Sequence, residues 1–252
     1  MMQQSCCPTD RTAVAGTLPE LKGILSDIEI SPNKIMQLYT SHSQSSGEWI
    51  VIVYDIFGLH PNNIELADWL ASNRGLNVAV PDILGDRHWP LDRFPPVCEE
   101  SKKCFNKFML EEANPQTKIG EVKATIDYLF AHKGAQHVSL LGLCWGAKIA
   151  SLLDSYMGKV KSTAFAHPSL LGFDDGKNAT VPTFVLPTKD DNLTLYLAGC
   201  LANKRPSLLK VSSNYTSTFH GFLGARGQWN QAEERVLVNQ AREELAQFFT
   251  TI

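Results

Sequence analysis

Short apolar runs alternate with amphipathic segments along most of the chain, beginning near residue 49. Residues 49–54 are continuously apolar, which is typical of a strand buried on both faces of a sheet. Apolar positions three and four residues apart mark residues 117–132 as an amphipathic helix. Further strands are predicted at residues 77–80, 137–141, 160–166, 182–186 and 207–212, and further helices at residues 62–73, 193–202 and 231–249. This repetition predicts an α/β fold, with a mostly parallel twisted sheet and helices on both faces.

The start of the chain and one internal region depart from this repetition. Residues 24–30 and 34–40 indicate an edge hairpin, joined by a Ser-Pro-Asn turn. We expect residues 1–20 to be a loosely ordered lead-in and residues 21–252 to form a single domain. Residues 84–114 are the least regular part, with a short amphipathic piece at about residues 104–110. A long insertion at this point is expected to form a lid or pocket wall.

Composition and charge narrow the functional classes. Of the 252 residues, 44% are hydrophobic, which is enough for a large core. The formal net charge is −3 and there is no basic block, so nucleic acid is not an expected partner. No apolar run has the length of a membrane span, and the polar start of the chain lacks the apolar core of a signal peptide. A membrane is therefore not an expected partner either.

The six cysteines show neither metal-ligand spacing nor a disulfide framework. The adjacent pair Cys6 and Cys7 is expected to be structural or inert. Because a catalytic thiol needs a reducing environment, a cytoplasmic location fits best.

One of these cysteines stands where an α/β chain carries a nucleophile. The predicted strand at residues 137–141 ends in Gly142-Leu143-Cys144-Trp145-Gly146, and a helix-like segment follows at once. This is the nucleophile-elbow pattern with cysteine in the serine position. The flanking glycines allow a sharp turn, and the first backbone N–H groups of the next helix, Trp145 foremost, face any negative charge that develops near the sulfur. A buried structural thiol is the alternative interpretation.

A nucleophilic thiol needs a base, and the base needs an orienting carboxylate. In α/β-hydrolases the chain order is nucleophile, acid, histidine. Here Cys144 is followed by Asp190 or Asp191 and then by His220, each after a predicted strand, where open α/β sheets bind ligands. Turn or helix-cap roles are the alternatives for the two aspartates and a turn cap for His220. His167 also ends a strand but precedes the acids, so it is expected to be a hydrogen-bonded pocket-wall histidine.

At these residues the chain resembles the dienelactone hydrolase family of α/β-hydrolases. The resemblance runs in order from about residue 49 to the C-terminal helix. Cys6-Cys7-Pro8 and His167-Pro168-Ser169 are similar to eukaryotic, fungal-type members. The matching pieces are Tyr54-Asp55-Ile56-Phe57-Gly58, Val80-Pro81-Asp82, Gly142-Leu143-Cys144-Trp145-Gly146, Val181-Pro182-Thr183 with Asp191, and His220-Gly221-Phe222 followed by Arg226-Gly227.

The resemblance implies a triad of Cys144, His220 and Asp191, since the family acid lies nine residues beyond the proline that opens its strand. It also implies an oxyanion hole made by the backbone N–H groups of Ile56 and Trp145.

Further family positions concern the resting thiol and the substrate. Asp55 takes the place of a glutamate that contacts the resting thiol in family members. Arg226 roughly matches one of the arginines that hold a substrate carboxylate, and Arg87 or Arg93 is a candidate for the second. Phe57 and His167 are expected to line the same site.

The resulting hypothesis is hydrolysis of small esters or enol lactones through a thioester acyl-enzyme, similar to carboxymethylenebutenolidase. It requires no metal or organic cofactor, and the protein is expected to be a monomer or homodimer. Two alternatives stay open at this point. One is a catalytically silent binding protein of the same fold. The other is a glycosidase-like site using a carboxylate pair such as Asp55 and Asp82.

Overall fold

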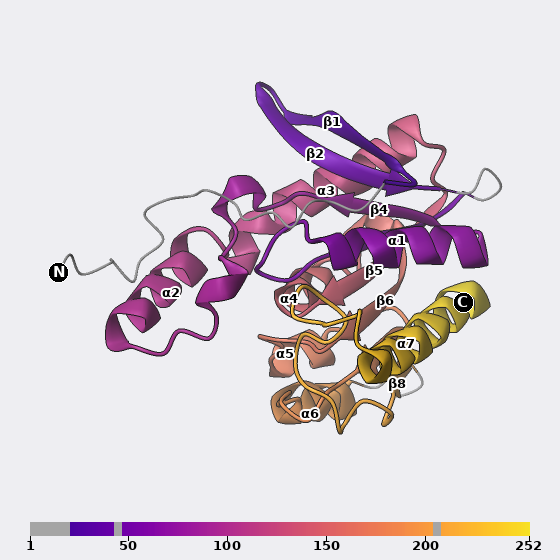
Figure 1. Cartoon of the computed structure of the whole chain (residues 1–252). Helices are drawn as coiled ribbons and strands as arrows, with labels where there is room; N and C mark the ends of the chain where they lie inside the picture. Colours follow the sequence, from indigo (N-terminus) through magenta and orange to yellow (C-terminus); the bar gives the residue numbers. More distant parts are fainter. Residues whose placement is uncertain (1–20, 43–46, 204–207) are drawn as a thin grey trace.

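A computed structural model describes residues 21–42, 47–203 and 208–252. Within these residues the chain forms one eight-stranded sheet with helices on both faces (Figure 1). The strand order is β1-β2-β4-β3-β5-β6-β7-β8. The strands are β1 (Ile24–Ser31), β2 (Lys34–Ser41), β3 (Glu48–Val53), β4 (Asn77–Pro81), β5 (His137–Leu143), β6 (Val160–Ala166), β7 (Thr183–Leu186) and β8 (Leu209–Val211). The expectations for residues 1–20, including Cys6 and Cys7, lie outside the described residues.

The predicted α/β architecture is confirmed. From β4 to β8 neighbouring strands are parallel, and only β1 and β2 add antiparallel pairs at one edge. The central strand β3 is buried on both faces, because the side chains from Trp49 to Val53 are at most 3% exposed. Parallel strands that are buried on both faces have continuously apolar sequences, as residues 49–54 do.

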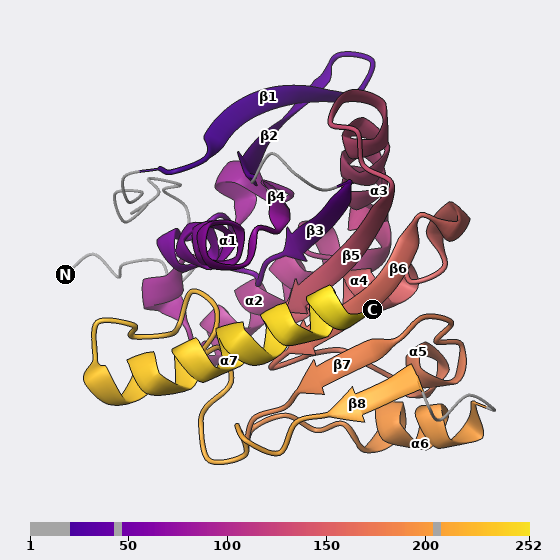
Figure 2. The same cartoon turned by 90° about the vertical axis from the view of Figure 1, so that its right-hand side faces the viewer.

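Two layers of helices cover the sheet, as Figure 2 shows. The helices α1 (Pro61–Arg74) and α7 (Ala232–Thr251) pack together over one face. The opposite face carries α3 (Pro115–His132) and α4 (Trp145–Leu152), with α5 (Phe173–Lys177) and α6 (Thr194–Ala202) nearer the β8 edge. No helix of the described residues is long and apolar enough to cross a membrane.

Local signals explain where the best-predicted helices begin and end. Pro61 opens α1, and the His60 side chain caps it by accepting from the Asn62 N–H. Gly75 then ends the helix in the left-handed region, with φ 64°. The structure therefore lengthens the predicted helix by one residue at each end.

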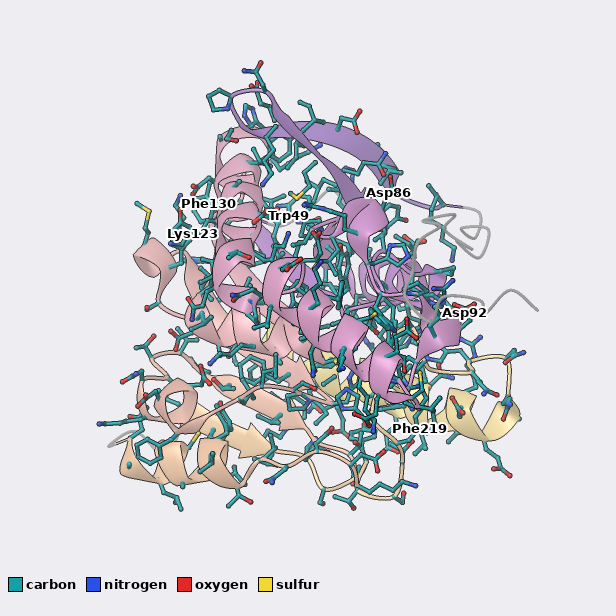
Figure 3. The ribbon with its side chains drawn as sticks, turned by 90° about the vertical axis from the view of Figure 1, so that its left-hand side faces the viewer. Trp49, Asp86, Asp92, Lys123, Phe130 and Phe219 are labelled. Carbon is teal, nitrogen blue, oxygen red and sulfur yellow. The ribbon has the colours of Figure 1, made fainter. Side chains whose placement is uncertain are left out.

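The irregular region contains more helix than the sequence predicts. Helix α2 (Glu99–Glu111) is thirteen residues long, because Cys98 and Ser101 form a reciprocal capping box at its start. Two 3-10 turns, Gly85–Arg87 and Leu91–Arg93, precede it, and Figure 3 shows this side of the molecule with Asp86 and Asp92 labelled on the two turns. An aromatic cluster formed by Trp89, Phe94, Phe105 and Phe108 holds the region together.

Three further expectations need correction. The short helix α5 has no counterpart among the predicted elements, since five residues are too few for a periodic signal. The last strand, β8, has three residues instead of the six expected. Cys104 is disulfide-bonded, so the expectation that the cysteines form no disulfide is wrong for this residue.

Candidate active site

The predicted elbow has the backbone that the sequence requires. Cys144 lies between the end of β5 and the start of α4 with φ 53° and ψ −114°, which is a strained conformation for a residue with a side chain. A Cβ on Gly146 would meet the carbonyl oxygen of Val53 at 1.9 Å, and one on Gly142 would meet Ala147 Cα at 2.4 Å. Gly146 is therefore needed for the turn to pack against β3, and Gly142 for β5 to pack against the start of α4. The packed turn holds the sulfur at the carboxyl end of the sheet.

The structure brings His220 and Asp191 into direct contact. Asp191 Oδ1 lies 2.5 Å from His220 Nδ1, and the aspartate side chain is fully buried. Its other oxygen accepts hydrogen bonds from the backbone N–H (2.7 Å) and the hydroxyl (2.9 Å) of Thr188. Asp190 instead accepts the backbone N–H of His220 at 3.0 Å. Of the two aspartates, Asp191 thus contacts the imidazole, and Asp190 holds the main chain of the same histidine.

Ser169, to which the sequence analysis gave no role in the site, contacts both the sulfur and the imidazole. Ser169 Oγ is 3.6 Å from Cys144 Sγ and 3.5 Å from His220 Nε2. The Ser169 backbone N–H also donates to the carbonyl oxygen of Cys144 at 3.0 Å. The available signal was the position of His167-Pro168-Ser169 directly after β6, the strand that pairs with β5.

Charge and burial set the protonation of His220. Burial of the ring opposes protonation, but hydrogen bonding and attraction to Asp191 and Cys144 outweigh it and raise the pKa of His220 to about 10. The imidazole is therefore held as a cation across the neutral range. The imidazole thus has the charge and position of the histidine that accompanies a nucleophilic cysteine.

His167 is a second, buried imidazole in the same site. Its ring packs edge-on against His220, with centroids 5.2 Å apart, and against Phe222 at 5.8 Å. Burial, together with the charge of His220, holds the pKa of His167 well below its usual range. Neither ring nitrogen has a hydrogen-bond partner within the described residues. This burial agrees with the predicted wall position, and the expected hydrogen bond of the ring stays a prediction.

The loop after β3 contains the predicted oxyanion donor Ile56. Among the turn and loop hydrogen bonds of the described residues, none has the backbone N–H of Ile56 or of Trp145 as its donor. Phe57, predicted to line the substrate site, is 7% exposed and packs edge-on against Phe94, with ring centroids 5.5 Å apart.

Asp55 is buried in that loop and 1% exposed. Its Oδ1 accepts the backbone N–H of Phe57 (3.0 Å), and its Oδ2 accepts that of Ala225 (2.9 Å). Burial raises the pKa of Asp55 to about 6, and these two hydrogen bonds moderate the effect. The carboxylate therefore joins the oxyanion loop to the loop that carries His220. Because both of its oxygens are occupied by backbone N–H groups, the Asp55 carboxylate is poorly placed for glycosidase chemistry. Asp82, the second carboxylate of the glycosidase alternative, accepts a hydrogen bond from the Tyr54 hydroxyl at 2.8 Å.

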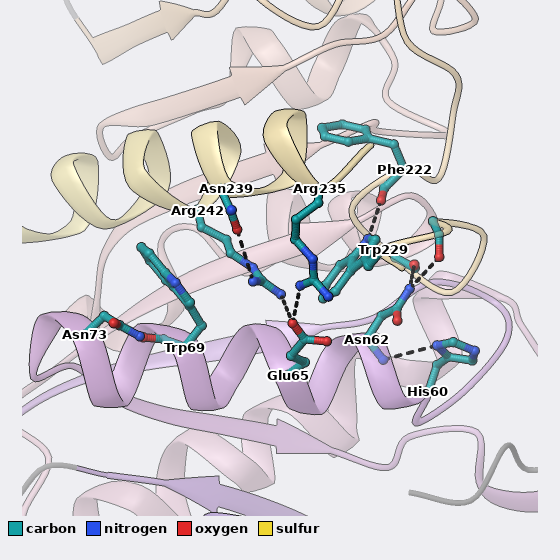
Figure 4. A network of polar contacts seen from close by, with 12 residues as sticks. His60, Asn62, Glu65, Trp69, Asn73, Phe222, Trp229, Arg235, Asn239 and Arg242 are labelled. Carbon is teal, nitrogen blue, oxygen red and sulfur yellow. Dashed lines mark hydrogen bonds and ion pairs between the residues drawn. The ribbon is translucent and has the colours of Figure 1, made fainter. Parts of the chain in front are cut away.

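Residues 212–231, hereafter the His220 loop, are held by side chains from elsewhere. Figure 4 shows Asn62 on α1 reaching this loop, where its Nδ2 donates to the carbonyl oxygens of Gly224 (2.8 Å) and Gly227 (2.9 Å). Within the loop, Trp229 Nε1 donates to the Phe222 carbonyl at 2.8 Å. In the same view, Glu65 of α1 pairs with Arg235 and Arg242 of α7, which fixes the helix that follows the loop.

The arginines expected near the substrate have different environments. Arg226 Nη1 donates to the His220 carbonyl at 2.6 Å, and its guanidinium lies over the rings of Phe94 and Phe219. Arg87 pairs with Glu112 at 3.2 Å. Arg93 has a buried Nη1 without a hydrogen-bond partner in the described part of the chain. Beside Arg226 and Phe219 opens a cavity of about 840 Å³, which is lined by neither Cys144 nor His220.

The parallel sheet and the strand–elbow–helix turn, with an acid and a histidine after later strands, define an α/β-hydrolase. The chain belongs to the dienelactone hydrolase family, whose sequence profile matches residues 36–251, and it is a hydrolase of the ester or lactone type. The resemblance noted from the sequence is thereby confirmed.

Relatives of the chain match over nearly its whole length. An AIM2 family protein of Schizosaccharomyces pombe is 28% identical, covering 98% of this chain and 99% of the relative. A carboxymethylenebutenolidase homolog of Homo sapiens is 23% identical, covering 96% of this chain and 95% of the relative. Among solved structures, a dienelactone hydrolase-like promiscuous phosphotriesterase from metagenomic libraries has a TM-score of 0.65 at 16% identity, covering 91% of this chain and 98% of the other. An esterase of Pyrococcus furiosus has a TM-score of 0.61 at 10% identity, covering 92% and 94%.

Proposed function

We propose that this protein hydrolyses small esters or enol lactones with Cys144 as the nucleophile, through a thioester acyl-enzyme. The observation that carries the proposal is the line of contacts from Cys144 through Ser169 and His220 to Asp191. This line provides a sulfur at the elbow, a base beside it and a buried carboxylate behind the base. It is the arrangement that nucleophilic acyl transfer needs.

In the first half of the reaction the thiolate of Cys144 attacks the substrate carbonyl, and the carbonyl electron pair moves to oxygen. The N–H groups of Ile56 and Trp145 stabilise this oxyanion, at ~3 kcal/mol for each donor. When the oxyanion collapses, the bond to the leaving oxygen breaks and His220 Nε2 gives its proton to that oxygen. Asp191 holds the imidazole in the tautomer and orientation that this step requires.

In the second half, water hydrolyses the thioester. The neutral His220 removes a proton from the water as it attacks the acyl carbon. The carbon–sulfur bond then breaks, which releases the carboxylic acid and restores the thiolate and imidazolium. A thiolate displaces enolates and other good leaving groups readily, so activated esters and enol lactones suit this site better than amides.

The substrate class is supported by the relatives named carboxymethylenebutenolidase homologs. A carboxylate on the substrate suits Arg226 together with Arg93. Arg93 has a buried nitrogen with no hydrogen-bond partner among the described residues, whereas Arg87 is paired with Glu112. Asp55 joins the loop of Ile56 to the His220 loop, and His167 packs against the ring of His220. A cytoplasmic location is part of the same proposal on the ground that the nucleophilic thiol must stay reduced, whereas the disulfide at Cys104 is a feature that favours an oxidising compartment.

The test is hydrolysis of 4-nitrophenyl acetate and of a carboxylate-bearing enol lactone by the wild type, Cys144→Ala and Cys200→Ala. Cys200 is a free, buried thiol away from the elbow and serves as the matched control. We expect Cys144→Ala to lose roughly 10³-fold or more of kcat/KM on both substrates. Cys200→Ala should keep the wild-type rate. Full activity in Cys144→Ala would overturn the proposal.

A further inference from the structure

The segment after β6 is built in an unusual way. His167 and Leu170 have φ values of 39° and 63°, so two residues with side chains adopt the left-handed region within four positions. Such strain persists only where the surroundings fix it, and it is common at functional sites. Between them Ser169 is anchored to the elbow by its backbone N–H, which donates to the Cys144 carbonyl. The strained segment therefore fixes the position of one side chain, that of Ser169.

That side chain is placed to serve two partners at once. A hydroxyl has one hydrogen to donate and two lone pairs to accept with. Its oxygen lies 3.6 Å from Cys144 Sγ, which is within contact range for the large sulfur atom, and 3.5 Å from His220 Nε2. Catalytic hydrogen bonds are often this long before substrate binds and shorten afterwards. The hydroxyl can thus donate to the sulfur while it accepts from the imidazole.

We propose that Ser169 is a catalytic residue, whose hydroxyl contacts both members of the charged pair of Cys144 and His220 and stabilises that pair. The hydroxyl donates its hydrogen to the thiolate and accepts from the Nε2–H group of the imidazolium. In the proposed cycle the proton already lies on His220 when the thiolate attacks, so the hydroxyl holds the charged pair and transfers no proton.

This inference rests on the proposed function, because it assigns a hydrogen-bond donor to the same nucleophile. A purely structural role for Ser169 makes a different prediction. If the residue only closes the turn, the backbone hydrogen bond to Cys144 suffices, and it survives any change of side chain. Loss of the hydroxyl would then leave the reactivity of the sulfur at each pH unchanged.

The test measures the pH dependence of Cys144 alkylation by iodoacetamide, without any substrate. Mass spectrometry of the Cys144 peptide separates this thiol from the others. The variants are Ser169→Ala, the nearly isosteric pair Ser169→Thr and Ser169→Val, and Ser151→Ala as control. Ser151 lies on α4, and its hydroxyl binds the Lys148 carbonyl and Asp175 away from the sulfur. The threonine–valine pair isolates the hydroxyl even if the alanine variant folds poorly.

We expect the half-maximal pH of alkylation to rise by about one unit in Ser169→Ala and Ser169→Val, because the thiolate loses a charge-assisted hydrogen bond. Below that pH the rate should fall about tenfold, since only the thiolate reacts. Ser169→Thr and Ser151→Ala should match the wild type. A common midpoint in all variants would overturn the role of Ser169. Hydrolysis that persists in Cys144→Ala would instead overturn the nucleophile, and the alkylation profile would still report on Ser169.

Discussion

The elbow and the His220 loop carry the two reacting partners, but they are held in place in opposite ways. The elbow is fixed by neighbouring backbone: β5 pairs with β3 and β6, and Gly142 and Gly146 allow the turn to pack tightly. The His220 loop contains no helix or strand between β8 and α7. Asp55, Asn62 and Asp190, all distant in sequence, hold its main chain.

The contrast teaches that the two halves of the site should fail differently. A change at the elbow strains a backbone packed inside the sheet, so it should lower the free energy of unfolding. A change in the contacts of the His220 loop should move the base and leave the core intact, so activity should suffer more than stability. The substitutions below test this difference.

The largest expected effect is at the buried acid. Asp191→Asn should lower kcat by about 10⁴-fold, because the amide no longer holds His220 in the required tautomer and charge. Asp191 also raises the pKa of His220 toward about 10. The wild type should therefore lose activity only as pH rises toward 10, where the imidazolium loses its proton. In Asp191→Asn that descending limb should move toward neutral pH, which a pH profile of kcat/KM measures.

Asp190→Asn is the matched control, since Asp190 binds only the backbone N–H of the same histidine. Its kcat should fall by less than about tenfold, as for the loss of one charge-assisted hydrogen bond. Equal losses in the two variants would contradict the assignment of Asp191 to the imidazole.

A pair of glycine substitutions compares the two regions directly. In Gly146→Ala the new methyl group meets the Val53 carbonyl at 1.9 Å, and a strand backbone cannot yield, so we expect a loss of about 3 kcal/mol in unfolding free energy. In Gly224→Ala it meets the Asp55 carboxylate at 2.4 Å, a side chain that can move. This variant should lose about 1 kcal/mol.

Activity should rank these variants differently from stability. Gly224→Ala should show the larger fall in kcat relative to its stability loss, because it disturbs the link between Asp55 and the His220 loop. Urea unfolding and steady-state kinetics on the same preparations provide both quantities. A Gly224→Ala variant with normal kcat would show that the loop needs no such link.

The fold and the elbow could be predicted from sequence because their determinants are local. Apolar periodicity marks the strands, Pro61 and Gly75 delimit α1, and the glycines around Cys144 mark the turn. The order of an acid and then a histidine along the chain after Cys144 predicted the other two members of the triad.

Three features of the site could not be predicted from the sequence. They are the contacts of Ser169 with the sulfur and the imidazole, the link that Asp55 makes between two loops, and the hydrogen bonds from Asn62 to the His220 loop. Each depends on a contact between segments far apart in the chain. Asp55, for example, meets Ala225 across 170 positions. The burial of both ring nitrogens of His167, without a hydrogen-bond partner in the described residues, could not be predicted either, because it is a property of the assembled site.

Asp55 predicts a pH effect on stability. Its pKa is raised to about 6, above the unfolded value near 3.9, so the folded state binds this proton more tightly. The free energy of unfolding should therefore fall as pH rises from about 4 to about 6, by on the order of 2 kcal/mol from this group. Asp55→Asn removes that fall, whereas Asp174→Asn, at an exposed site on α5, should keep it. Identical pH slopes in the wild type and Asp55→Asn, measured by urea unfolding, would contradict the assignment.

The smallest expected effect concerns the anchor on α1. Asn62→Ala removes two hydrogen bonds to the His220 loop and should cost about 1 kcal/mol of stability, with a several-fold lower kcat. Asn73→Ala removes one exposed hydrogen bond, to the Trp69 carbonyl on the same helix, and should change neither quantity measurably. Thermal melts and kinetics of the two variants provide the comparison. Normal kcat in Asn62→Ala would show that the loop holds its own shape.

The central claim is that the sulfur of Cys144 forms the covalent bond to the substrate. The most direct measurement mixes the wild-type enzyme with an activated ester, quenches in acid within the first turnovers and locates the acyl group by peptide mass spectrometry. The account predicts one acyl group, on the peptide that contains Cys144, and none on that peptide in Cys144→Ala. An acyl group found on Ser169 or any other residue, with Cys144 unmodified, would contradict it.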